Sequence, residues 1–139
     1  MSIEVKEALV ERVDHEGESI AFIIRAEKSV EETTFLTPED FKQQIGFIVY
    51  PKGDEIVRHI HKPMERHLVG MSEILLVKKG LLEADFYTDE KQYLETRELG
   101  EGDLVLLVSG GHRFRCMEDT VLLEIKQDPY IGQEEKERF

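Results

Sequence analysis

The sequence predicts an all-β protein in which short antiparallel strands form a sandwich or a barrel. Nine runs of 6 to 8 residues are rich in Ile, Val, Leu, Phe and Tyr, and glycine, proline and acidic residues separate them. Short β-rich runs at intervals of roughly 8–12 residues are typical of antiparallel sandwiches and barrels. A helical signal occurs in one place, and no internal repeat or linker divides the chain.

The predicted strands begin at residue 19 and continue almost to the end of the chain. They cover residues 19–26, 45–50, 55–61, 73–80, 81–87, 92–99, 103–109, 112–117 and 120–126. Turn-forming residues separate them, as at 51–54 and 110–111. Residues 2–13 are compatible with a helix or a strand, and residues 126–139 are expected to be extended and solvated.

One short helix is expected within residues 36–44. Thr37 can cap its start, Pro38 suits the first helical position, and the two acidic residues that follow favour the positive end of the helix dipole. The segment predicts one or two helical turns between the first two strands.

Length and charge limit the domain count and the partners. A chain of 139 residues is expected to form one domain, residues 1–139, with a single core. The formal net charge of -12 repels phosphate backbones and anionic headgroups, so nucleic acids and membranes are not expected as partners. The single cysteine, Cys116, fits a reducing compartment, and no stretch has the length of a signal or a membrane span, so a cytoplasmic location is expected.

Candidate metal ligands follow from the alternation of side chains along strands. His59 and His61 are two residues apart, so in a strand they share a face and can converge on one ion. Glu73 begins the next predicted strand, and His112 begins a later one. If the strands bring them together, three imidazoles and one carboxylate surround a divalent transition metal ion.

The spacing of these residues resembles the two signatures of the cupin superfamily. The first signature is matched by Gly53, His59, His61, Glu73 and Gly80, and the second by Gly102, Gly110 and His112. The resemblance covers residues 53–116 and implies the small double-sheet jelly-roll barrel of that family. It also implies that His59, His61, Glu73 and His112 bind one metal ion, such as Fe, Mn, Ni or Zn.

The chain departs from the family pattern in the spacing between the histidine pair and the glutamate. Eleven residues, 62–72, separate His61 from Glu73 where three or four are usual, so Glu65 is a rival ligand. Glu73 is preferred because six residues separate it from Gly80, as in the signature. The insert is predicted to be a lid at the pocket mouth. The candidate substrate contacts are Lys62, Arg66, His67, Arg97 and Phe114.

Two functions from different classes are compatible with this site. Resemblance to metal cupins implies a metalloenzyme with isomerase or dioxygenase chemistry on a small polar or sugar-like molecule. The alternative is a binding module that holds a small ligand without turnover. A homodimer is also expected, because residues 19–26 are apolar on both faces and free sheet edges need cover.

Overall fold

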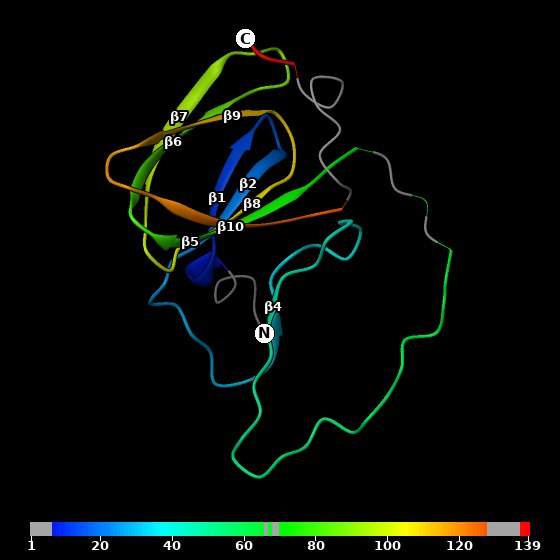
Figure 1. Ribbon diagram of the computed structural model, residues 1–139. Helices are drawn as coiled ribbons and strands as arrows, with labels where there is room; N and C mark the ends of the chain where they lie inside the picture. The colour runs from blue at the N-terminus through cyan, green and yellow to red at the C-terminus, as the bar shows by residue number, and fades with distance from the viewer. Residues whose placement is uncertain (1–6, 66, 68–69, 128–136) are drawn as a thin grey trace.

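The protein is built mostly of antiparallel β-strands. The computed structural model describes residues 7–65, 67, 70–127 and 137–139, which contain ten strands and a short helical turn at residues 7–9 (Figure 1). None of the helical segments in the described ranges is long and apolar enough to span a membrane. The predicted mostly-β class is confirmed.

A five-stranded antiparallel sheet forms the larger layer. Its spatial order is β1-β2-β8-β5-β10. The strands are β1 (Glu11–His15), β2 (Glu18–Ile24), β8 (Leu104–Leu107), β5 (Glu73–Lys79) and β10 (Val121–Lys126). The central strands are rich in Ile, Leu and Val, which suit a strand that is covered on both faces.

A three-stranded antiparallel sheet in the order β7-β6-β9 faces the first sheet. Its strands are β7 (Tyr93–Gly100), β6 (Leu81–Tyr87) and β9 (Gly111–Cys116), and a two-stranded pair joins β3 (Thr34–Phe35) to β4 (Gly46–Phe47). Apolar side chains from both larger sheets pack into one core. Its buried members are Val13, Ile20, Ala21, Ile23, Leu75, Val77, Leu82, Ala84, Phe86, Leu99, Val105 and Leu107.

The other face of the five-stranded sheet carries a second core. Phe22 and Ile24 of β2 and Leu106 of β8 are buried there, and Leu36 together with Phe41 of the segment before β4 packs over them. The two apolar faces of β2 are therefore both covered by the protein's own chain. The homodimer was predicted partly because both faces of residues 19–26 are apolar. Since these faces are covered within one chain, that prediction needs another basis.

Three local predictions differ from the structure. Residues 36–44 form turns instead of a helix, because the Thr37 hydroxyl accepts the backbone N–H of Ile45 (3.0 Å) and donates to the side chain of Gln44 (2.8 Å). These bonds hold Thr37 against the far end of the segment, where a helix cap would bond to the next turn. Residues 55–61 do not form a strand, and the strand expected at 45–50 is limited to Gly46–Phe47.

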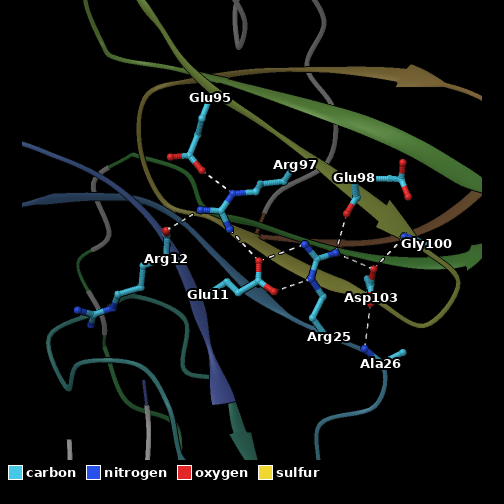
Figure 2. Close-up of polar contacts among 9 residues, drawn as sticks. All are labelled: Glu11, Arg12, Arg25, Ala26, Glu95, Arg97, Glu98, Gly100 and Asp103. Carbon is cyan, nitrogen blue, oxygen red and sulfur yellow. Dashed lines mark hydrogen bonds and ion pairs between the residues drawn. The ribbon is translucent and has the colours of Figure 1, made fainter. Parts of the chain in front are cut away.

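Ion pairs close one side of the sandwich (Figure 2). Glu11 of β1 accepts two hydrogen bonds from the Arg25 guanidinium (2.7 and 3.1 Å), and Arg97 of β7 donates to the same carboxylate at 2.7 Å. Arg25 also donates to Asp103 (3.1 Å) and to the backbone carbonyl of Glu98 in β7 (2.6 Å). The network therefore joins the edge of the larger sheet to the edge of the smaller one.

Asp103 fixes the chain around this network. Its carboxylate accepts the backbone N–H of Ala26 (2.9 Å) and that of Gly100 (2.8 Å), besides the guanidinium of Arg25. These bonds secure the end of β2 and the turn between β7 and β8 at one point. The hydrogen bond from Arg25 is the main cause that lowers the pKa of Glu11, and the same bond raises the pKa of Arg25.

The lowered pKa of Glu11 predicts an acid-dependent loss of stability. Its contribution is complete above the ordinary carboxyl pKa of 4.5 and is lost as pH falls through the lower pKa of the folded state. Replacing Glu11 with Gln should reduce the free energy of unfolding by about 1 kcal/mol at pH 7, because the site is partly solvated. Urea unfolding between pH 7 and pH 3 measures both effects.

The exposed Glu18 of β2 offers a matched control. Glu18→Gln should leave the stability and its pH dependence close to those of the wild type. If Glu11→Gln and Glu18→Gln unfold alike at every pH, the network does not stabilise the fold.

Candidate functional site

His59 and His61 lie in an exposed segment that leaves the body of the protein after β4 (Figure 1). Their rings are neighbours, with centroids 5.2 Å apart and planes inclined by 72°. His59 Nδ1 lies 2.8 Å from the carbonyl oxygen of Val57. When Nδ1 carries the hydrogen of this bond, the lone pair of Nε2 remains available to a metal ion, which is the usual arrangement of ligating histidines.

Glu73 lies at the start of β5 and on its interior face. The register of the sheet pairs Glu73 with Leu107 on one side and with Lys126 on the other. Alternate residues of a strand share a face, so Glu73 points to the same side as Leu75 and Val77, which belong to the core between the sheets.

His112 occupies the matching position on the smaller sheet. It pairs with Phe86 of the core, and it shares a face with Phe114, whose ring centroid lies 5.2 Å from that of the imidazole. His112 is exposed and Glu73 is half-buried, so the interior face is open to solvent near the histidine. Both candidate ligands therefore face the space between the sheets.

The chain connections place these two residues at the same end of the sandwich. Leu107, which pairs with Glu73, ends β8, and Gly111 begins β9 after a short connection. Gly110 in that connection approaches the carbonyl of Tyr87, the residue at the end of β6. The start of β5, the end of β6 and the start of β9 therefore meet where His112 lies.

The structure does not gather the complete ligand set. Within the described part of the chain, no three His, Cys, Asp or Glu side chains group closely enough to hold a metal ion. His59 and His61 lie on the exposed segment, together with the rival ligand Glu65, whereas Glu73 and His112 lie on the sandwich. Binding by all four residues requires the exposed segment to move onto the open end.

The candidate substrate contacts lie in three different environments. Lys62 and His67 are exposed in the insert, and Arg66 lies outside the described residues. Arg97 is held by Glu11 and Glu95, in the ion-pair network of Figure 2, and Phe114 packs against the core. The structure therefore does not bring the four described residues into one pocket.

A small pocket that the sequence did not indicate lies on the other face of the larger sheet. It has a volume of about 130 Å³ and is lined by residues that include Phe41, Lys42, Met71, Leu106 and Val108. Its apolar lining comes from the segment before β4, from Met71 before β5, and from the end of β8 with Val108 after it, so residue types alone gave no signal for it. The pocket opens on the face of the sheet opposite to that of Glu73, although Met71 and Ser72 of its lining directly precede Glu73 in the chain.

Comparisons of the chain with protein-family models, with curated proteins and with solved structures find no match. The candidate site therefore depends on the signature spacing in the sequence and on the positions that the fold gives to those residues.

The backbone conformation of Gly110 predicts the effect of a mutation in the connection between β8 and β9, just before His112. Its φ is +69°, and a Cβ atom there would lie 2.2 Å from the carbonyl oxygen of Tyr87. Gly110→Ala should therefore lower the free energy of unfolding by about 2–3 kcal/mol, through backbone strain and a clash with a fixed carbonyl. Thermal and urea unfolding measure the loss.

Gly17 provides the control, because its φ is +80° but no atom lies within 4 Å of an added Cβ. Gly17→Ala should cost about 1 kcal/mol, from the backbone conformation alone. Equal losses in the two variants would show that the Tyr87 contact does not constrain the connection.

Proposed function

We propose that the protein is a cupin-type metal-binding domain whose ion is held by His59, His61, Glu73 and His112. The observation that carries the proposal is that Glu73 and His112 face the same interior space from opposite sheets, at one end of the sandwich. The signature spacing in the sequence predicted the same two residues. The antiparallel two-sheet arrangement supports the further proposal of a jelly-roll barrel.

The remaining two ligands reach the site when residues 55–61 lie beside β9. In the described part of the chain β9 pairs with β6 alone, so its other edge can accept a strand. A strand added there widens the smaller sheet, and alternation places His59 and His61 on one of its faces. With that face directed inward, both imidazoles approach His112.

The donor set suits a divalent transition metal ion. Three imidazole nitrogens and one carboxylate oxygen are ligands for Fe, Mn, Ni or Zn, and the bond between His59 Nδ1 and Val57 leaves Nε2 for the ion. A bound ion of this kind supplies Lewis-acid or redox chemistry at a position left open by the protein. Phe86, Leu107 and Phe114 surround the site with apolar side chains that limit the access of water.

This environment supports a metalloenzyme that acts on a small polar or sugar-like molecule by isomerase- or dioxygenase-type chemistry. Lys62, Arg66 and His67 of the insert are the proposed substrate contacts, since the insert begins directly after the histidine pair. The apolar neighbours of the ligands also favour a second function, in which the pocket holds a small ligand without turnover.

Metal content tests the ligand set. Protein expressed with added transition metals and purified without chelators should carry about one ion per chain, by elemental analysis. His59→Ala, Glu73→Ala and His112→Ala should each lower the content severalfold, because each removes one ligand. Glu65→Ala is the matched control and should retain the ion.

Two results would overturn the assignment. One is wild-type protein that stays free of metal after supplementation. The other is a Glu65→Ala variant that loses the ion while Glu73→Ala keeps it, which would identify Glu65 as the ligand.

A further inference from the structure

The segment that carries the histidine pair exposes an unusual amount of apolar surface. We call residues 50–65 the arm. The exposed fractions of Ile56, Val57, Ile60 and Met64 are 59, 73, 87 and 72%. Figure 1 shows the arm as a broad loop that extends away from both sheets. Side chains of this kind are normally covered in a soluble protein, so the arm is expected to have a binding surface.

A matching surface lies along the side of the sandwich opposite the ion pairs. There β9 and β10 are the outer strands of their sheets, and in the described residues each pairs with one neighbour only. Val121, Leu123 and Ile125 of β10 are about half exposed, at 54, 50 and 53%. Unpaired edges next to exposed apolar residues are sites where another strand adds.

The arm begins with a turn and continues as an exposed segment. Residues 51–54 form a turn, in which the N–H of Asp54 donates to the carbonyl of Pro51 at 3.1 Å and Gly53 has a φ of +95°. The stretch after this turn, residues 55–61, alternates Ile56 and Ile60 on one face with the histidines on the other.

We propose that the arm of one chain docks on the edges of β9 and β10 of a second copy, and that the second copy's arm docks in return. The part that concerns the metal rests on the proposed function. Each ion is then held by His59 and His61 of one chain and by Glu73 and His112 of the other. The site is incomplete in a single chain.

A second copy of the chain is the partner because one chain carries both the segment that docks and the surface that receives it. Every chain carries an exposed arm and two edges, those of β9 and β10, that are open among the described residues, so a two-fold symmetric exchange covers all four surfaces at once. A different protein would cover one of these surfaces and leave the other exposed. The arm also leads away from its own sandwich, which favours exchange between chains over folding back (Figure 1).

A register follows from the requirement that the histidines meet His112. In an antiparallel pairing with β9, His61 lies opposite His112 and Val57 lies opposite Cys116. Cys116 shares its face with His112 and is exposed, and it is the only cysteine in the sequence. Opposed residues of antiparallel strands have Cα atoms about 4.5–5.5 Å apart, within the range of a disulfide bond.

Disulfide trapping tests the exchange without any metal. Val57→Cys should form a disulfide with Cys116 of the second copy under mild oxidation, in which two thiols lose two electrons and two protons to an added disulfide such as oxidised glutathione. A covalent dimer should appear on a non-reducing gel. It should disappear in Val57→Cys/Cys116→Ser, and Ile56→Cys, on the opposite face, should react at least tenfold less.

Each alternative outcome of the trapping experiment overturns the exchange. A disulfide within one chain would show that the arm folds back on its own β9. If the Val57→Cys variant forms no disulfide with Cys116, either within a chain or between chains, residues 55–61 do not lie beside β9.

Mixing two variants tests the shared metal site. His59→Ala/His61→Ala removes the arm ligands, and Glu73→Ala/His112→Ala removes the ligands of the sandwich, so each variant alone should lack the ion. A heterodimer purified with two different tags should recover about one ion, because one of its two sites has all four ligands. A heterodimer without metal, alongside metal-loaded wild type, would overturn the shared site.

The two experiments separate the exchange from the proposed function. If wild-type protein binds no metal but the covalent dimer forms, the metal site fails and the exchange stands. If wild-type protein binds metal but the disulfide lies within one chain, the metal site stands and the exchange fails.

Discussion

The carboxylate of Glu11 links the edges of the two sheets at one side of their shared core. It receives guanidinium groups from Arg25, at the end of β2, and from Arg97, in β7 of the opposite sheet. These partners are partly shielded from solvent, which strengthens the ion pairs relative to fully exposed ones. Within the described residues the sandwich is consequently closed at the side of β1 and β7 and open at the side of β9 and β10.

This asymmetry explains where a functional site can form. The interior near Glu11 is occupied by charged side chains that already satisfy one another. At the opposite side the interior face ends in Glu73 and His112, next to apolar residues and to the edge of β9 that no described strand pairs with. Donor atoms beside apolar walls at an open edge are suited to a bound ion and a small ligand.

The sequence predicted the strands whose signals are local. Residues 73–80 and 81–87 are apolar runs divided by Gly80, whose φ of +101° suits the reversal, and they became β5 and β6. The helix expected within residues 36–44 failed because Thr37 bonds to Ile45 across the whole segment. Residues 55–61 have a strand-like pattern, but a strand forms only where a neighbour pairs with it.

For the candidate site too, the sequence predicted only the features that depend on local pattern. Strand alternation puts Glu73 on one face with Leu75 and His112 on one face with Phe114, and the register of the sheets agrees with both pairings. The ion-pair network could not be predicted, since Arg97 and Glu11 are 86 residues apart in the sequence and meet only in the folded chain. The position of the arm relative to β9 likewise depends on contacts between distant residues, which leave no local pattern in the sequence.

Hydrogen exchange of the arm backbone tests the central claim most directly, namely that residues 55–61 complete the open side of a second copy. At high protein concentration, the amides of residues 55–61 that point toward β9, and the β9 amides that point away from β6, should be protected from exchange, because they pair across the two chains. After equilibration at a concentration low enough to separate the chains, the same amides should exchange rapidly, while those of β2 and β8 stay protected. Rapid exchange of residues 55–61 at every concentration would contradict the account.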